Sequence, residues 1–396
     1  MQMQAEIYSQ AQIILDRLIA FPTVSDDSNT ALVDYVDAYL RSYGVAPVRV
    51  PHGSAPKDAL YAHIGPVIEG AVVLSGHSDV VPVAGQNWDS DPFQLTEREG
   101  KLFGRGTCDM KGFVALALAT VPHAVKADLK RPLQIALSFD EEVGMTGAPV
   151  MLDHMETHGV PRGGAVIVGE PTSMDLVTAH NGGFGYRVHV HGYEVHSSIM
   201  HKGVSAVMMA ARLIEWANQA NEKAAARPPE GINKTFDPHY STVHVGVISG
   251  GTALNITAKD CEFVTDFRIV PGDDYTVLMK AFEAEVARLD AAMKAVRPEA
   301  GISLDLDFHV PGFMREPDNV AVALARRLSS SQTERVVSFL TEAGLFQQRG
   351  YPTVVCGPGD IAQAHQPNEF ITLDQVSKGA DFMARLVADL CADAQS

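Results

Sequence analysis

The stretch Leu102-Phe-Gly-Arg-Gly-Thr-Cys-Asp-Met-Lys-Gly112 holds a single carboxylate, Asp109, in a glycine-rich turn just before an apolar run of helical character. Glycine permits tight turns and close approach of the backbone, which a larger residue would block. A carboxylate can also bind cations through both of its oxygens. Asp109 is therefore well placed to bridge two metal ions, and the other ligands must come from elsewhere in the chain.

Apolar runs on both sides of this stretch predict the fold. Residues 71–76, 132–139 and 164–168 are typical of buried strands, and helical patterns at 113–125 and 147–158 alternate with them. This alternation predicts an α/β domain with a doubly wound, mostly parallel sheet. In such sheets, binding sites form where the carboxyl ends of the strands open into loops. Further helices are expected at 4–20, 30–43 and 374–392, and further strands at 45–50, 60–64, 335–340 and 352–356.

The pattern changes after residue 178 and returns at about 311. Between these points the expected elements follow the order β-α-β-β-α-β, which is typical of the ferredoxin-like α+β sandwich. We therefore predict a catalytic domain of residues 1–178 plus 311–396, with residues 179–310 inserted as a lid and dimerisation domain. The expected elements of the insertion are strands at 185–190, 242–248, 261–269 and 302–308 and helices at 203–221 and 273–294.

The composition of the chain limits its partners. With 31 basic and 48 acidic residues among 396, the formal net charge is −17, which argues against nucleic acid or an anionic membrane. The four cysteines are far apart and predict neither a disulfide framework nor a thiolate zinc site. The N-terminal residues lack the pattern of a signal peptide, and no apolar run is long enough to span a membrane, so we expect a cytoplasmic protein.

Metal-binding residue types follow three of the predicted strands. His77, Glu142 and Glu170 lie at or just after strand ends, and His365 lies late in the chain in Ala364-His-Gln-Pro367. Imidazole and carboxylate groups are common zinc ligands, and hydrolytic zinc sites leave one position open for water. Each of these residues alone is more often structural. The prediction of a metal site therefore depends on their coincidence at one edge of one sheet.

Two neighbouring acids are left for other roles. Glu141, beside Glu142, can take a proton from the attacking water and pass it to a leaving amine. Asp79, two residues after His77, can hydrogen-bond the imidazole and hold its metal-binding tautomer. Each also has a structural alternative, which is an exposed strand-end acid for Glu141 and a turn residue for Asp79.

Several strings, in order along nearly the whole chain, resemble one known family, the dinuclear zinc aminoacylase and deacylase peptidases. The resemblance implies a metal-dependent hydrolase with two zinc ions as cofactors. The matching strings are Gly76-His-Ser-Asp-Val-Val-Pro82, Gly104-Arg-Gly-Thr-Cys-Asp-Met-Lys-Gly112, Asp140-Glu-Glu142, Gly169-Glu-Pro-Thr172, Gly357-Pro-Gly-Asp360 and Ala364-His-Gln-Pro367.

The resemblance assigns the ligands of each ion. It implies that His77, Asp109 and Glu170 hold one zinc ion. It implies that Asp109, Glu142 and His365 hold the second, for which Co²⁺ or Mn²⁺ is an alternative. It also implies a cis peptide bond after Asp109, and it agrees with the roles of general base and orienting residue proposed above for the two neighbouring acids.

The same resemblance gives the inserted domain a function. In the family this domain is a lid that forms a homodimer, and a lid histidine reaches the active site of the partner to polarise the scissile carbonyl. His196 matches that histidine, although Glu194 and Val195 precede it where relatives often have a small residue and a glycine. Asn255 and Arg268 match lid positions that hold the substrate carboxylate, a role that suits the planar guanidinium of arginine.

The substrate is expected to be a small N-acyl amino acid. The strings Trp88-Asp-Ser-Asp-Pro-Phe93 and Thr341-Glu-Ala343 are most similar to family members that hydrolyse N-acetyl-L-ornithine to L-ornithine and acetate in arginine biosynthesis. In this interpretation Glu342 and Gly344 lie at the substrate, and the Glu342 carboxylate faces its cationic side chain. The alternatives are a deacylase or dipeptidase of the same family, such as one for succinyl-diaminopimelate or an N-acylglutamate, and a non-catalytic member.

Overall fold

The computed structural model describes residues 1–25 and 27–392, and the chain divides into two compact units. Unit 1 contains Met1–Thr178, Arg315–Arg335 and the chain from Thr341 onward, and unit 2 contains Ala179–Met314 and Val336–Leu340. The sequence pattern predicts residues 311–314 and 336–340 in the first domain. They lie with unit 2 because Phe313 pairs with His180 through two backbone hydrogen bonds and Val336 packs in a cluster with Phe236.

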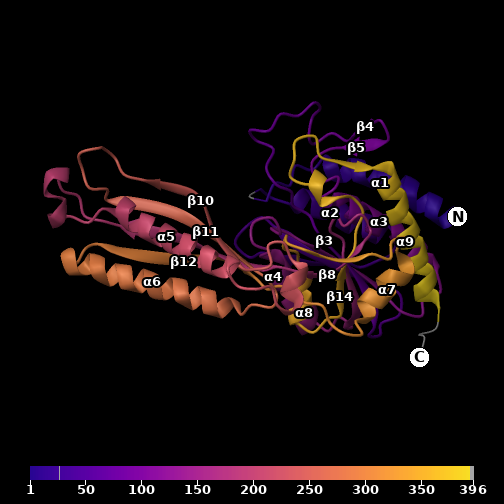
Figure 1. Cartoon of the computed structure of the whole chain (residues 1–396). Coiled ribbons are helices and arrows are strands. Elements are labelled where there is room, and N and C mark those ends of the chain that lie inside the picture. Colours follow the sequence, from indigo (N-terminus) through magenta and orange to yellow (C-terminus); the bar gives the residue numbers. More distant parts are fainter. Residues whose placement is uncertain (26, 393–396) are drawn as a thin grey trace. The chain divides into compact units, whose positions relative to one another are not determined.

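A mostly parallel sheet forms the centre of unit 1, which confirms the predicted fold class (Figure 1). Its four middle strands are parallel, and the strands next to them, β2 and β8, pair antiparallel with β6 and β14. The strand order is β1 (Val48–Pro51), β2 (Asp58–Ile64), β6 (Leu133–Ser138), β3 (Ala71–His77), β7 (Gly163–Val168), β14 (Thr353–Val355), β8 (Leu176–His180) and β13 (Glu334–Val337).

Helices cover both faces of this sheet. One face shares a single apolar core with α1 (Gln2–Ile19), α2 (Thr30–Ser42), α3 (Lys111–Lys126), α7 (Val320–Leu328) and α9 (Leu373–Cys391). The helices α4 (Gly147–Thr157) and α8 (Ala343–Gln348) contact β2, β6 and β14 without contributing to that core. Within residues 1–25 and 27–392, no helix combines the length and the apolar character needed to cross a membrane.

A second, three-stranded sheet of unit 1 was not predicted. It consists of β4 (Thr96–Arg98), β5 (Lys101–Phe103) and β15 (Phe370–Thr372), which are too short to show a periodic pattern. Phe370 pairs with Phe103, so the preceding residue, Glu369, lies opposite Gly104 at the start of the glycine-rich turn. The pairing therefore brings a segment from near the C-terminus to the turn that carries Asp109.

Unit 2 has the predicted order β-α-β-β-α-β. Its four strands form an antiparallel sheet in the order β10-β11-β9-β12, with two long helices running along it (Figure 1). The elements are β9 (Gly182–His191), α5 (Ala206–Ala225), β10 (Thr242–Gly250), β11 (Asp260–Ile269), α6 (Tyr275–Val296) and β12 (Gly301–Val310), with short 3₁₀ helices η1 (Ser197–Lys202) and η2 (Gly231–Thr235).

Candidate metal centre

His77 is the last residue of β3, a strand that is buried along its whole length. Its Nδ1 lies 2.9 Å from the backbone carbonyl oxygen of Asp79. Because a carbonyl can only accept, Nδ1 must carry a proton, so Nε2 of the neutral ring presents a lone pair. Nε2 lies 3.2 Å from Oδ1 of Asp109 and 3.8 Å from Oε1 of Glu170. The strand end thus directs an imidazole in a metal-binding tautomer at two carboxylates.

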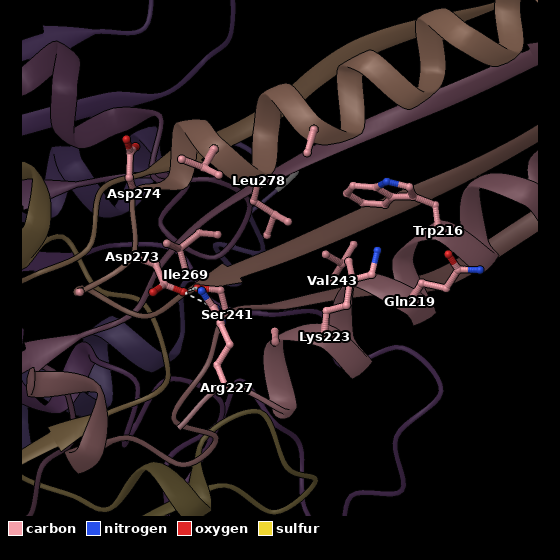
Figure 2. Close-up of a pocket in the computed structure, with 15 residues that line it drawn as sticks. Trp216, Gln219, Lys223, Arg227, Ser241, Val243, Ile269, Asp273, Asp274 and Leu278 are labelled. Atoms are coloured by element: carbon pink, nitrogen blue, oxygen red, sulfur yellow. Dashed lines mark hydrogen bonds and ion pairs between the residues drawn. The ribbon is translucent and has the colours of Figure 1, made fainter. Parts of the chain in front are cut away.

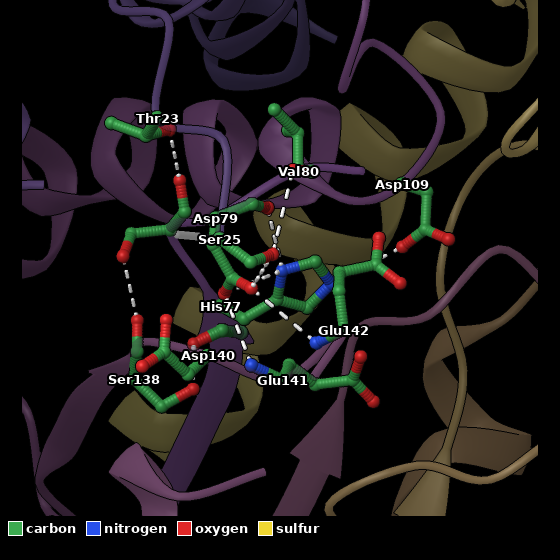
Figure 3. Close-up of polar contacts among 12 residues, drawn as sticks. Thr23, Ser25, His77, Asp79, Val80, Asp109, Ser138, Asp140, Glu141 and Glu142 are labelled. Carbon is green, nitrogen blue, oxygen red and sulfur yellow. Dashed lines mark hydrogen bonds and ion pairs between the residues drawn. The ribbon is translucent and has the colours of Figure 1, made fainter. Parts of the chain in front are cut away.

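Asp79 contacts His77 through both its backbone and its side chain. Its backbone oxygen lies 2.9 Å from Nδ1 of His77, and Oδ1 of its carboxylate lies 3.4 Å from the same nitrogen. The carboxylate accepts the hydroxyl of Ser25 at 2.7 Å and the backbone N–H groups of Glu141 and Glu142 at 3.2 and 3.3 Å (Figure 3). Asp79 therefore connects the end of β3 to the loop after β6, which carries the next two acids.

Asp109 faces both histidines. Its Oδ1 lies 3.2 Å from Nε2 of His77, and its Oδ2 lies 3.2 Å from Nε2 of His365. The side chain is buried, and the peptide bond to Met110 is cis, as the family resemblance implied. Burial opposes ionisation of this carboxyl group, but the two imidazoles outweigh it and lower its pKa. One carboxylate thus presents one oxygen to each of two groups of ligand atoms.

Close packing holds the turn that carries Asp109. Gly106 has a φ of +87°, and a Cβ at this position would lie 2.7 Å from Cγ1 of Val80. A Cβ on Gly112 would lie 2.4 Å from the backbone oxygen of Thr107. A side chain at either position would force its close-packed neighbours to shift, and at Gly106 the positive φ would add backbone strain.

Glu142 and His365 complete the second group of ligand atoms. Nε2 of His365 lies 3.0 Å from Oε2 of Glu142, and the backbone oxygen of His365 accepts a hydrogen bond from Gln86 at 2.8 Å. Hydrogen bonds to Asp109 and Glu142 raise the pKa of His365 to about 10. Burial, followed by the Asp109 carboxylate, raises the pKa of Glu142 to about 7.

Within residues 1–25 and 27–392, the only cationic side chain close to Glu141 and Glu170 is that of His77. Burial raises the pKa of each well above its usual value, and the neighbouring carboxylates raise it further. Oε1 of Glu170 is buried and makes no hydrogen bond to any described residue. A buried carboxylate oxygen without a donor is energetically costly, unless a cation compensates it.

Three sets of atoms in this region could each hold a metal ion. Their donors are imidazole nitrogens and carboxylate oxygens, which suit zinc and other divalent first-row metals, and the crowded carboxylates need positive charge. The residues therefore fit a pair of metal ions with Asp109 shared between them. The sets are His77, Asp109 and Glu170; Asp109, Glu142 and His365; and His77, Glu141 and Glu142.

Cys108 lies beside the bridging carboxylate but is not part of these sets. Its thiol donates to the backbone oxygen of Asp360 at 3.3 Å, and burial raises its pKa well above the usual value. A protonated thiol is a poor metal ligand, since the thiolate is the binding form. This placement agrees with the interpretation of Cys108 as a packing residue.

Glu369 is the residue of this region that the sequence analysis missed. Its Oε1 accepts the backbone N–H groups of Gly106, Cys108 and Asp109 at 3.1, 2.9 and 3.1 Å, and its Oε2 accepts from Arg105 at 2.7 Å. The carboxylate therefore holds the whole turn from inside the protein. Only the pairing of β5 with β15 brings it there, and no local sequence pattern predicts that pairing.

The remaining predicted residues of unit 1 are Glu342 and Gly344. Glu342 is 1 % exposed, and it accepts hydrogen bonds from the hydroxyl groups of Ser75 and Ser138 on β3 and β6. Gly344 is buried in α8. These hydrogen bonds hold the Glu342 carboxylate against β3 and β6, and its contact with a cationic substrate side chain stays a prediction. The buried serines of these two mostly apolar strands were the sequence signal for a buried polar partner.

Three predicted residues belong to unit 2. His196 and Asn255 lie close together, since the N–H of Ser197 donates to the carbonyl oxygen of Asn255 at 2.9 Å. Arg268 lies on β11, and its Nε donates to Oδ2 of Asp266 at 3.0 Å. The contact of these three residues with substrate stays a prediction.

Comparison with known proteins decides the family. The model of peptidase family M20/M25/M40 matches residues 73–389, which include all five predicted metal ligands. The chain belongs to peptidase family M20/M25/M40. An acetylornithine deacetylase from Myxococcus xanthus is 34% identical over 389 residues, covering 95% of this chain and 96% of the relative. Another from Pasteurella multocida is 34% identical over 382 residues, covering 94% and 96%.

Solved structures of M20 proteins share the fold. An M20 metallo-carboxypeptidase from Sulfolobus solfataricus aligns with a TM-score of 0.77 at 16% identity, covering 96% of this chain and 99% of that chain. A Bacillus subtilis protein described as a dinuclear metal-binding peptidase of family M20 aligns with a TM-score of 0.63 at 15% identity, covering 97% and 98%. Membership of M20 makes this chain a metal-dependent hydrolase of the metallopeptidase and amidohydrolase type.

Proposed function

We propose that this M20 protein is a two-zinc deacylase that hydrolyses N-acetyl-L-ornithine to L-ornithine and acetate. The observation that carries the proposal is Asp109, whose two oxygens face the imidazoles of two separate ligand sets. The names of the relatives support the substrate. The excess of acidic residues is compatible with a substrate that carries a positive charge.

In this proposal His77 and Glu170 complete the site of one ion, and Glu142 and His365 complete the site of the other. Bound zinc ions lower the pKa of water and polarise a carbonyl group. The protein holds the donors in place beforehand, because His77 is fixed by the backbone of Asp79 and Asp109 by its turn. This preorganisation keeps the ligand atoms from rearranging during the reaction.

Glu141 is the proposed general base. It shares one ligand set with His77 and Glu142, but it is not needed for the two sets that share Asp109. Its carboxylate takes a proton from the attacking water and returns it to the amide nitrogen, so that the amine can leave. Asp79 positions Glu141 by accepting its backbone N–H, an assistance that the sequence analysis did not expect.

His196 is the proposed donor to the oxyanion. The backbone N–H of Ser198 lies 3.2 Å from Nδ1 of His196, so Nδ1 accepts and, in the neutral ring, Nε2 carries the proton. Nε2 can then donate a hydrogen bond to the oxygen that gains charge during attack. Together with Asn255 and Arg268 for the substrate carboxylate, this role requires a homodimer formed through unit 2, as the family resemblance implies.

The experiment that tests the function is a panel of N-acyl amino acids. Release of free amine is measured for N-acetyl-L-ornithine, N-acetyl-L-glutamate, N-succinyl-L,L-diaminopimelate and a dipeptide, each with and without a chelator. We expect the highest kcat/KM for N-acetyl-L-ornithine and loss of activity with the chelator. Higher kcat/KM for another member of the panel would overturn the substrate, and chelator-resistant turnover would overturn the metal mechanism.

A further inference from the structure

A cavity in unit 2 has no role in the proposed reaction (Figure 2). Its volume is about 490 Å³, and it lies between the C-terminal half of α5, the strands β10 and β11, and the first turns of α6. Small-molecule sites commonly have volumes of about 300–1,000 Å³. The cavity is therefore large enough for a ligand of roughly ten non-hydrogen atoms.

One wall of the cavity is apolar. Trp216 is half-buried, and its ring lies 5.3 Å from that of Phe282, which fixes the indole against the core of unit 2. Val243 and Ile269 from the strands and Leu278 from α6 continue this wall. These side chains provide a surface for the apolar part of a ligand, whose burial is favourable in proportion to the area removed from water.

The acidic groups at the cavity already have partners. Oδ2 of Asp273 lies 3.1 Å from Nη2 of Arg227 and accepts the hydroxyl of Ser241 at 2.7 Å. Oδ1 of Asp274 accepts the backbone N–H and the hydroxyl of Thr276 and thereby caps α6. Arg227 and Asp273 therefore neutralise one another, and Asp274 compensates the positive end of a helix.

Lys223 is the cation that remains. Within residues 1–25 and 27–392 its side chain makes no hydrogen bond or ion pair, and Figure 2 shows it extending beside Val243, whereas Arg227 points toward Asp273. A lysine in the last turn of a helix also interacts favourably with the helix dipole, but that interaction needs no ligand. The cavity thus combines an apolar wall with one uncompensated ammonium group.

We propose that this cavity binds a small amphipathic monocarboxylate. The carboxylate group pairs with Lys223, and the aliphatic or aromatic part lies against Trp216 and Leu278. A neutral ligand of the same shape would gain no ion pair with the ammonium group, and a cationic one would be repelled by it. The charge of the ligand is therefore the property that the cavity selects.

Isothermal titration calorimetry of the full chain with octanoate tests this proposal, with octylamine as a probe of equal length and opposite charge. We expect saturable, one-to-one binding of octanoate and none of octylamine. Octanoate should also change the emission of Trp216, one of two tryptophans in the chain, and the Trp216→Phe variant should lose that change. Non-saturable binding of octanoate, or equal binding of both probes, would overturn the proposal.

Two variants and one matched control locate the ligand. Lys223→Gln should weaken octanoate binding by about tenfold or more, since it removes the charge from an exposed position without disturbing packing. Ala224→Phe should weaken it by filling the cavity. Lys280→Gln removes the same charge from an exposed position on α6 outside the cavity and should leave the affinity unchanged. Equal losses in Lys223→Gln and Lys280→Gln would show a non-specific charge effect and refute the proposal.

Discussion

Glu369 accepts the backbone N–H of Asp109 at 3.1 Å, so a buried carboxylate that is not a predicted metal ligand holds the residue predicted to bridge the two ions. Its other oxygen accepts from Arg105, which is itself buried. The ion pair allows this carboxylate to remain charged close to several others, and a charged acceptor makes stronger hydrogen bonds than a neutral one.

Replacing Glu369 by glutamine should lower both the stability of the protein and its affinity for metal ions. The variant loses the charge opposite Arg105 and weakens the bonds to the turn, so the free energy of unfolding should fall by about 1–3 kcal/mol. Metal affinity should fall by about 10–100-fold, as for other residues that orient ligands. Denaturant unfolding and competition with a chelator measure the two effects. Glu97→Gln, an exposed acid of the same small sheet, is the control, and unchanged metal affinity in Glu369→Gln would contradict the assignment.

Removal of a ligand that belongs to only one set should release one ion and retain the other. His365 belongs only to the set with Asp109 and Glu142, so His365→Asn should retain one tightly bound ion and lose the other. Asp109→Asn should weaken both. Metal content after dialysis, measured by mass spectrometry, distinguishes these outcomes, and His158→Asn at an exposed histidine is the control. Two ions retained by His365→Asn would show that the second set is wrongly composed.

Glu141→Gln should keep both ions and lose turnover. The glutamine has nearly the same shape but cannot take a proton, so kcat should fall by about 100-fold or more. Glu142→Gln provides the contrast, since it should lower metal content as well as turnover. The measurement is kcat alongside metal content in the same preparations. Wild-type turnover in Glu141→Gln would exclude this residue as the base.

His196→Ala should lower kcat by about 10²–10³-fold with little effect on KM, because the proposed hydrogen bond strengthens as charge develops on the substrate oxygen. The matched control is His201→Ala, which removes an exposed imidazole from η1, the short helix that His196 caps. Steady-state kinetics with the best substrate of the panel gives both constants. Equal kcat values for the two variants would argue against the oxyanion role.

Gly106→Ala should destabilise unit 1 more than Gly100→Ala does. Both glycines have a positive φ, but a Cβ on Gly100 meets no atom within 4 Å, whereas one on Gly106 lies 2.7 Å from Val80. The conformational cost for a non-glycine residue is about 1–2 kcal/mol at either position, and the collision adds to it only at Gly106. Denaturant unfolding of both variants measures the difference, and equal losses would show that the turn relaxes without cost.

Local sequence patterns predicted the structural features that depend on residues close together in the chain. The alternation of apolar strands and helices gave the mostly parallel sheet, and the strand-end positions of His77, Glu142 and Glu170 follow from it. The small sheet was missed because three-residue strands have no detectable period, and with it the position of Glu369. The contacts of Glu342 were not foreseen for a related reason, since its partners, the hydroxyls of Ser75 and Ser138, lie 267 and 204 residues away in sequence.

The pairing of β15 with β5 has a consequence for biosynthesis. The turn that presents Asp109 is held by a residue 260 positions further along the chain, and His365 lies in the same late segment. During translation, about nine-tenths of the chain must leave the ribosome before this turn can be held, since domains fold as their parts emerge. In a ribosome-bound chain that ends before His365, the set of Asp109, Glu142 and His365 is incomplete, so the proposed second ion could be bound only after nearly the whole chain has been made.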